Sequence, residues 1–269
     1  MKRIILIILF TLFPAAASAS EAPVDIKLNG ERLFHDTEII LSDGRVYAPV
    51  RFISRAFSCQ VDWDGQNVLL EMPGLSAKIP VGKTTATVNG KAYSLTNAAW
   101  IADGRTYLPI RSIAELFGAE VSWDNTKKSV LLTHPNITVP EDCIDRSYSD
   151  DDLDWLSKIV HAEAQDEEHT GKIAVANVVL NRVQSSEFPD SIYDVIFDRR
   201  YGVQFTPTAN GAIYNNPLSS CVLAAKEALY GASPVGECLY FFNDKIAASS
   251  WISQNRPYYT TIGNHKFYL

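Results

Sequence analysis

The sequence predicts an α+β chain of two domains, in which a module of β-hairpins and short helices precedes a mainly helical domain. Three observations predict this. Residues 24–134 contain two segments that match at a constant offset of sixty, and both carry hairpin signals. Residues 150–269 open with two helix-periodic apolar segments. The stretch between them, 135–149, contains Pro135 and Pro140 and lacks periodicity, which is typical of a linker.

The N-terminus predicts a signal peptide. Lys2 and Arg3 form a basic start, residues 4–13 are apolar but too few to span a bilayer, and residues 17–19 fit a cleavage site. We therefore expect residues 1–20 to be removed and the protein to be secreted, with an uncleaved anchor as the alternative. No later stretch is apolar enough to predict a membrane span.

Composition is that of a globular protein, with 46% apolar and 20% charged residues. The formal net charge is −7, and no basic patch is interleaved with aromatic residues. An acidic protein gains nothing from long-range attraction to phosphate chains. We expect no nucleic-acid partner, and an anionic wall polymer would have to be recognised by short-range contacts.

The repeat is clearest in its central motif. Residues 43–51 read D-G-R-V-Y-A-P-V-R, residues 103–111 read D-G-R-T-Y-L-P-I-R, and each is followed by F and V-x-W-D. Asn-Gly and Asp-Gly pairs predict hairpins, and a proline at the first turn predicts short helices over 49–57 and 109–117. Each copy therefore contains strands, a helix and strands, and two copies could bury each other's apolar faces.

This repeat resembles the exported module named for the copper amine oxidase N-terminal domain, over about residues 24–134. The name does not imply copper here, because only His35 lies inside the repeat and imidazole is the usual copper ligand. Residues of a duplicated fold usually recur because the packing recurs. We therefore expect structural roles for Tyr47, Arg51, Tyr107 and Arg111.

Glu163 is the candidate catalytic residue. The acidic run 150–152 predicts a helix start, after which Leu153, Leu156, Val160 and Glu163 recur at three- and four-residue spacing. The carboxyl group then lies on the buried stripe, where burial raises the pKa as a general acid requires near neutral pH. The alternative is that Glu163 marks the solvated end of the helix.

A nearly all-apolar segment, 171–183, predicts a buried central helix in which Asn177 and Asn181 are core amides. Beyond it the sequence is aromatic and irregular, with helical periodicity only over 219–230. Rings interspersed with amides suit a sugar-binding cleft, although we expect half of the rings to form the core.

Four cysteines are present, and none forms a C-x-x-C pair. Cys221 and Cys238 are the candidate disulfide, with two buried thiols as the alternative; Cys59 and Cys143 are expected to be free. No metal and no cofactor are expected. A metalloenzyme would have to use histidines such as His161, without H-E-x-x-H spacing.

Six motifs follow in order over residues 152–269: H-A-E-A, I-A-V-A-N-V-V-L-N-R-V, Y-D-V-I-F, Q-F-T, C-L-Y-F-F-N and I-G-N-H-K-F-Y. Together they resemble the cell-wall hydrolase family of the spore-cortex-lytic enzymes SleB and CwlJ. The resemblance implies a lysozyme-like helical domain that cleaves peptidoglycan between N-acetylmuramic acid and N-acetylglucosamine. It also implies that Glu163 is catalytic. The charged residues 166–169 and the phenylalanine at Phe241 depart from the family pattern.

The resemblance offers one secure carboxylate, since Asp166 and Glu167 are expected to be solvated. One carboxyl group suffices for a lytic transglycosylase, which we expect here, acting on the cell wall or on spore cortex during germination. A hydrolytic muramidase and a non-catalytic wall-binding protein are the alternatives. The first module is expected to bind the wall or a protein partner. Candidate substrate-binding residues are Gln204, Phe205, Thr206, Tyr240 and Trp251.

Overall fold

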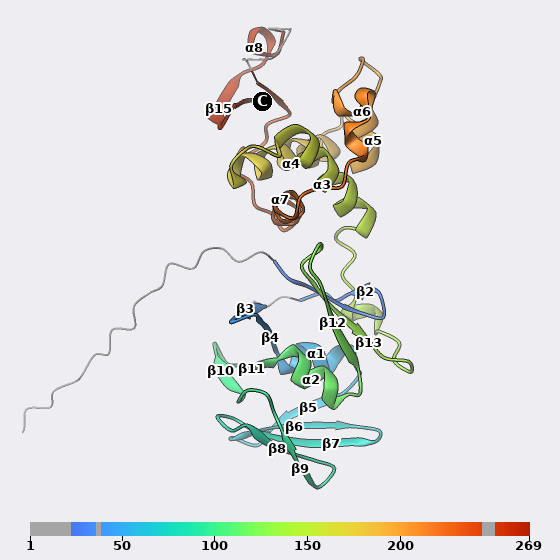
Figure 1. Cartoon of the computed structure of the whole chain (residues 1–269), viewed down its shortest axis with the longest axis vertical. Helices are drawn as coiled ribbons and strands as arrows, with labels where there is room; N and C mark the ends of the chain where they lie inside the picture. Colours follow the sequence, from blue (N-terminus) through green and yellow to red (C-terminus); the bar gives the residue numbers. More distant parts are fainter. Residues whose placement is uncertain (1–22, 36–38, 244–250) are drawn as a thin grey trace, which may run out of the picture.

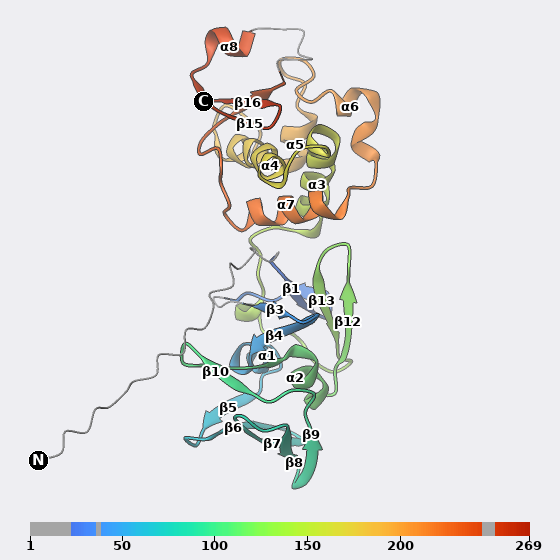
Figure 2. The same ribbon diagram turned by 60° about the vertical axis from the view of Figure 1, so that its left-hand side comes forward.

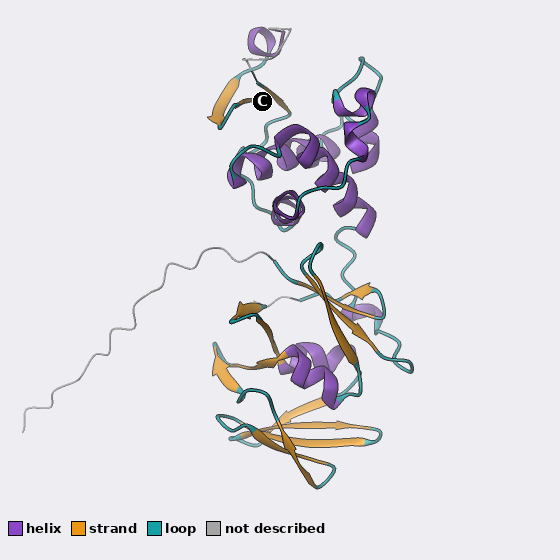
Figure 3. Cartoon of the chain, in the orientation of Figure 1, coloured by secondary structure: helices purple, strands orange, loops and turns teal. Residues whose placement is uncertain are grey.

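A β-rich part and a helical part make up the computed structural model, which describes residues 23–35, 39–243 and 251–269. The predicted signal peptide lies outside these residues. The β-rich part comes first in the chain and the helical part follows it (Figure 1, Figure 3), which confirms the predicted α+β class. No helix in the described ranges has the length and hydrophobicity needed to cross a bilayer.

The described part of the first domain contains three sheets and two short helices. The first sheet has the order β12 (Glu120–Asp124), β13 (Ser129–Thr133), β1 (Asp25–Leu28) and β2 (Glu31–Arg32). The second has the order β10 (Trp100–Ala102), β11 (Arg105–Pro109), β4 (Arg45–Pro49) and β3 (Ile40–Ser42). The third runs β5 (Gln60–Trp63), β6 (Asn67–Met72), β7 (Leu75–Pro80), β8 (Thr85–Val88) and β9 (Lys91–Ser94). The helices are α1 (Val50–Ala56) and α2 (Ile110–Leu116).

Four hairpins turn where the sequence predicted them. Asn29, Asp43, Asn89 and Asp103 have φ values of 51°, 50°, 49° and 47°, and a glycine with positive φ follows each. Two successive left-handed residues form the type I′ turn, whose twist matches that of the flanking strands. These dipeptides therefore set the strand pairing locally.

The second sheet brings residues sixty apart face to face. β4 and β11 pair antiparallel, with Ala48 opposite Leu108 and Tyr47 opposite Pro109. Behind the sheet, the rings of Phe57 and Phe117 stack with their centroids 4.7 Å apart. The fully buried side chains around them form one hydrophobic core.

The second domain consists of helices and a small terminal sheet. Its helices are α3 (Asp150–Ala164), α4 (His169–Gln184), α5 (Ile192–Phe197), α6 (Pro207–Asn210), α7 (Ser219–Leu229) and α8 (Trp251–Asn255). Its strands are β14 (Tyr240–Phe242), β15 (Tyr258–Ile262) and β16 (His265–Tyr268), in the order β14-β16-β15. Short 3₁₀ turns span Glu141–Cys143 and Ala212–Tyr214.

Helix α4 is the central helix, as predicted. Val175 and Val179 join the core formed with α3 and α7, whereas Ala174 and Val178 face a second cluster that includes Phe267 of β16. The terminal sheet was not expected, because aromatic residues that alternate over so few positions do not distinguish a strand from a loop. Burial against the far side of α4 stabilises this sheet.

A buried aspartate joins the two domains. Strand alternation directs Ile26 and Leu28 into the first core and Asp25 toward the second domain, where it is 1% exposed. Nζ of Lys226, a fully buried residue on α7, lies 2.9 Å from its carboxylate. The hydroxyl of Tyr230 donates to the same carboxylate at 2.8 Å. In Figure 2, α7 lies above the sheet that contains β1.

Further polar contacts surround this pair. The hydroxyl of Tyr148 donates to Asp25 at 3.1 Å, and Nζ of Lys226 also donates to the carbonyl oxygen of Lys127 at 2.7 Å. Burial lowers the pKa of Lys226, while the charge of Asp25 opposes that change. Burial also raises the pKa of the Tyr148 hydroxyl, which therefore stays a donor. The carboxylate of Asp25 therefore has one cation and two tyrosine hydroxyls as partners.

We expect Lys226→Met to lower the free energy of unfolding by about 3–5 kcal/mol, because the buried Asp25 would lose its ion-pair partner. Adding Asp25→Asn should recover part of that loss. Lys78→Met, which breaks an exposed pair with Asp64, is the control and should cost less than about 1 kcal/mol. Denaturant unfolding of the variants measures these values, and a Lys226→Met protein as stable as the parent would contradict the role of this pair.

Candidate active site

Helix α3 carries Glu163 in its last turn. The helix starts at a capping box, in which the Ser149 hydroxyl accepts from the Asp152 amide at 3.0 Å and the Asp152 carboxylate accepts from the Ser149 amide at 2.8 Å. Leu156 and Val160 are fully buried, so the predicted apolar stripe is confirmed. The stripe points Glu163 inward as the helix ends.

Burial changes the acidity of Glu163. The residue is only partly exposed, and burial raises the pKa of its carboxyl group from the ordinary value of 4.5 to about 7. Removing water disfavours the ionised form more than the neutral one. At neutral pH the group can therefore give a proton and afterwards take one back.

Glu167 differs from its expected role, because it is not a solvated acid. Its side chain is only 8% exposed and lies 3.5 Å from Nδ1 of the buried His265. The amide and the side-chain amide of Asn264 donate to its carboxylate at 3.1 and 2.9 Å. Although burial opposes the change, these hydrogen bonds lower the pKa of Glu167. The ionised group ties the α3–α4 turn to the β15–β16 turn.

Two glycines make room for this carboxylate. A Cβ atom at Gly263 would lie 1.9 Å from Oε2 of Glu167, and one at Gly171 would lie 3.1 Å from its Cβ. Gly263 also has a φ of +58°, which L side chains rarely adopt. The chain therefore closes over Glu167 at both turns. The I-G-N-H stretch was the only sequence signal for this contact.

The polar residues of α4 hold the loop that leads to β14. The side-chain amide of Asn177 donates to the carbonyl of Ala232 at 2.7 Å, and that of Asn181 donates to the carbonyls of Gly236 and Cys238 at 2.7 and 2.9 Å. This confirms that both asparagines are core amides. They hold the loop that precedes the aromatic strand β14.

Arg182 is a residue that the sequence analysis did not single out. Its guanidinium is buried among the rings of Phe188, Phe205 and Tyr240, with centroids 4.8, 5.2 and 5.5 Å away. Its Nε donates to the carbonyl of Leu239 at 2.7 Å. Burial lowers the pKa of Arg182 to about 10, yet the group stays charged at neutral pH. It therefore joins α4, the aromatic loop and β14.

The candidate substrate-binding residues differ in their exposure to solvent. Trp251 is 51% exposed, and its ring centroid lies 6.4 Å from that of the half-buried Tyr240. Gln204 is half-buried and Thr206 is exposed at the start of α6. Phe205, by contrast, is 3% exposed and belongs to the hydrophobic core, so its ring offers no face to a sugar.

The cysteines pack as apolar side chains. All four are free and buried, so the candidate disulfide between Cys221 and Cys238 is absent from this structure. The physical reason is that Cys221 lies in the core of α3, α4 and α7, whereas Cys238 lies in the cluster on the other side of α4. Burial raises the pKa of the Cys238 thiol to about 11. No group of three or more metal-ligating side chains occurs among the residues that the structure describes.

Comparison with known proteins gives matches to both halves of the chain. A family described as Cell Wall Hydrolase matches residues 166–268, and one described as Copper amine oxidase N-terminal domain matches residues 27–132. The first match begins three residues after Glu163, so it does not include that residue.

Two curated relatives are each described as a spore cortex-lytic enzyme. A spore cortex-lytic enzyme of Halalkalibacterium halodurans is 41% identical over 120 residues, which are 45% of this chain and 35% of that protein. One of Bacillus cereus is 39% identical over 124 residues, 46% of each chain. This chain therefore spans less than half the length of these relatives. A solved structure described as the catalytic domain of the germination-specific lytic transglycosylase SleB from Bacillus anthracis is 38% identical, with a TM-score of 0.43; the match covers 47% of this chain and all of that one.

We expect Gly263→Ala to destabilise the protein by about 2–4 kcal/mol, because it adds a clash with Glu167 to backbone strain. Gly211→Ala is the matched control: its φ of +84° imposes strain, but no atom lies within 4 Å of the added Cβ. Thermal unfolding of both variants separates the two effects. Equal losses would contradict a close contact between Gly263 and Glu167.

The raised pKa of Glu163 also predicts a pH-dependent stability. The native state holds this proton more tightly than the unfolded state, so ionisation destabilises the native state as the pH rises from 4.5 through about 7. Glutamine cannot ionise, so the Glu163→Gln variant should not lose this stability. As the pH rises from about 5 to about 8, its free energy of unfolding should increase by about 1–2 kcal/mol relative to that of the parent. Denaturant unfolding at both pH values measures the gain. Asp166→Asn, at an exposed carboxyl, is the control; a gain no larger for Glu163→Gln would contradict the raised pKa.

Proposed function

We propose that this chain, which carries a cell wall hydrolase domain behind a copper amine oxidase N-terminal domain, is an exported enzyme that cleaves the glycan strands of peptidoglycan. The reaction proposed is that of a lytic transglycosylase at the bond between N-acetylmuramic acid and N-acetylglucosamine. The observation that carries the proposal is Glu163, a partly buried carboxyl group whose pKa is raised to about 7. The family match and the spore cortex-lytic relatives support the substrate class.

Glu163 first acts as a general acid. Its protonated carboxyl gives the proton to the glycosidic oxygen, and the bond to the anomeric carbon of the muramic residue breaks. The resulting carboxylate then takes the proton from the C6 hydroxyl of the same sugar while that oxygen attacks the anomeric carbon. The products are a 1,6-anhydro end and a free hydroxyl end, and Glu163 regains its proton.

A two-acid hydrolase needs a second carboxylate, and Asp166 and Glu167 are the sequence neighbours considered for that role; Asp166 is exposed. Glu167, four residues further on, is ionised and held by Asn264. A group that already accepts these hydrogen bonds is poorly placed to activate a water. This favours a nucleophile supplied by the substrate over water, the nucleophile of a hydrolytic muramidase.

The remaining assignments belong to the same proposal. Gln204, Thr206, Tyr240 and Trp251 are substrate-binding candidates, and the second domain is of the lysozyme-like kind. We propose residues 1–20 as a signal peptide, 24–134 as a duplicated module, 135–149 as the linker and 150–269 as the catalytic domain. The register that places Ala48 opposite Leu108 supports the duplication. The protein would act in the cell wall or spore envelope.

Glu163→Gln should lower cleavage of purified peptidoglycan by at least about 10³-fold while binding persists, because glutamine cannot donate the proton. Mass spectrometry of the wild-type digest should detect 1,6-anhydro ends; ends heavier by one water would identify a muramidase instead. Cortex and vegetative peptidoglycan are compared in parallel. If wild-type protein pellets with sacculi yet releases no ends of either kind, the chain is a wall-binding protein and the proposal fails.

The wild-type rate should also fall as the pH rises through about 7, since only the protonated carboxyl donates. The measurement is the initial rate of end release between about pH 5 and about pH 9. Asp166→Asn should keep the same profile. A rate that rises with pH across this window would contradict the role of Glu163 as the acid.

A further inference from the structure

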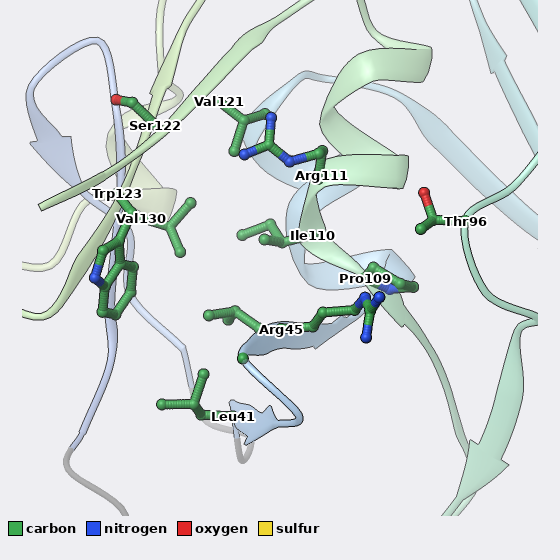
Figure 4. A pocket seen from close by; sticks show the side chains of 12 residues that line it. Leu41, Arg45, Thr96, Pro109, Ile110, Arg111, Val121, Ser122, Trp123 and Val130 are labelled. Atoms are coloured by element: carbon green, nitrogen blue, oxygen red, sulfur yellow. The ribbon is translucent and has the colours of Figure 1, made fainter. Parts of the chain in front are cut away.

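The first domain contains two surface grooves, each built from both copies of the repeat. One groove, of about 440 Å³, is lined by residues 109–111 at the start of α2 and by residues 121–123 of β12. Residues 44–46 of the other copy complete it (Figure 4). Its volume lies within the range of roughly 300–1,000 Å³ that is typical of ligand sites.

The second groove repeats this arrangement with the copies exchanged. It has a volume of about 620 Å³ and is lined by residues 49–51 and 61–63 of the first copy and by residues 104–106 of the second. Every one of these positions lies sixty residues from its counterpart in the first groove. The pairing of β4 with β11 carries the hairpin of each copy to the helix of the other.

Packing does not explain the residues that recur in these grooves. Buried residues of a repeat recur because they fill equivalent cores. Trp63 and Trp123, however, are 45% and 40% exposed, and Arg51 and Arg111 are exposed as well. An exposed tryptophan and an exposed arginine in the same groove, present twice, point to recognition of a ligand. The structural role expected for Arg51 and Arg111 therefore does not by itself explain why they recur.

The charge of the first groove indicates an anion. Arg45 and Arg111 line it, and no carboxylate is among the lining residues that the structure describes. In Figure 4 the Arg111 side chain extends toward the strand that carries Val121 and Trp123, and the Arg45 guanidinium lies beside Pro109. Arg111 makes only an exposed contact of 3.8 Å with Glu115, which contributes little. Both guanidinium groups are available to a ligand.

The second groove differs from the first in having a carboxylate in its lining. Arg51 and Arg105 correspond to Arg111 and Arg45, but Asp62 occupies the position that Ser122 has in the first groove. Arg55 also lines it and pairs with Asp142 at 2.6 Å. A carboxylate in the lining repels an anionic ligand, so the first groove should bind such a ligand more tightly.

We propose that both grooves bind carboxylate-bearing disaccharide-peptide units of peptidoglycan, with the tryptophan ring against a sugar face and the arginine against a carboxylate. The identity of the polymer rests on the proposed function; the ligand chemistry rests on the grooves. Two equivalent grooves suit a polymer of repeating units, because a second contact on the same chain becomes intramolecular and raises the avidity. Short-range arginine contacts also offset the repulsion between an acidic protein and an anionic wall.

The test uses the full chain with Glu163→Gln, so that ligands stay intact. Calorimetry measures binding of soluble disaccharide-peptides with free carboxylates and of the same fragments with amidated carboxylates. Trp123→Ala and Arg111→Ala should each weaken binding of the free-acid fragments about tenfold, and the amidated fragments should bind about tenfold more weakly than the free acids. Trp63→Ala and Arg51→Ala should have smaller effects. Arg146→Ala, an exposed arginine outside both grooves, is the charge control.

Unchanged binding in the Trp123 and Arg111 variants, or equal binding of amidated fragments, would overturn the inference. A parallel cleavage assay uses the same substitutions in the wild-type background, where end release from soluble glycan should be unchanged. Loss of binding with normal cleavage supports the grooves. Normal cleavage without groove-dependent binding would contradict only the inference about the grooves. Absence of cleavage by the wild-type protein would contradict only the proposed enzymatic function.

Discussion

The side chain of Asp25 is buried where the two domains meet, and their arrangement depends on how its carboxylate is compensated. Lys226 and two tyrosines from the second domain supply the compensation. Next to them, Lys27 and Lys127 of the first domain pair with Asp150, the first residue of α3. The helix that begins at this interface ends at Glu163. The junction between the domains and the candidate active site are thus opposite ends of one rigid element.

The site itself combines two acids with opposite properties. Burial without a partner raises the pKa of Glu163, whereas donors from the β15–β16 turn lower the pKa of Glu167 and keep it ionised. Desolvation is the only cause that acts on Glu163, whereas at Glu167 the hydrogen bonds outweigh desolvation. Gly171 and Gly263 permit the second arrangement by leaving space for the carboxylate. One acid is thereby left free for proton transfer.

The first domain shows how a repeated unit can acquire a surface function. Pairing of β4 with β11 about Ala48 and Leu108 buries the apolar faces of both copies. The same pairing places a hairpin arginine of one copy and the tryptophan strand of the other in one groove, twice. The stabilising contact and the proposed grooves therefore have one geometric origin. Attachment through the proposed grooves would keep the proposed catalytic domain beside its insoluble substrate.

The sequence by itself determined those features that depend on forces between residues close together in the chain. The Asn-Gly and Asp-Gly turns, the proline-led helices, the apolar stripe beneath Glu163 and the buried central helix follow from steric preferences and periodicity within a few residues. Only the tertiary structure decided what long-range contacts control: the partners of Glu167 lie 97 residues away, and Tyr230 lies 205 residues from Asp25. It also placed Phe205 in the core and Cys221 and Cys238 on opposite sides of α4. Whether a charge or a thiol is buried, and what compensates it, depends on groups that no local pattern brings together.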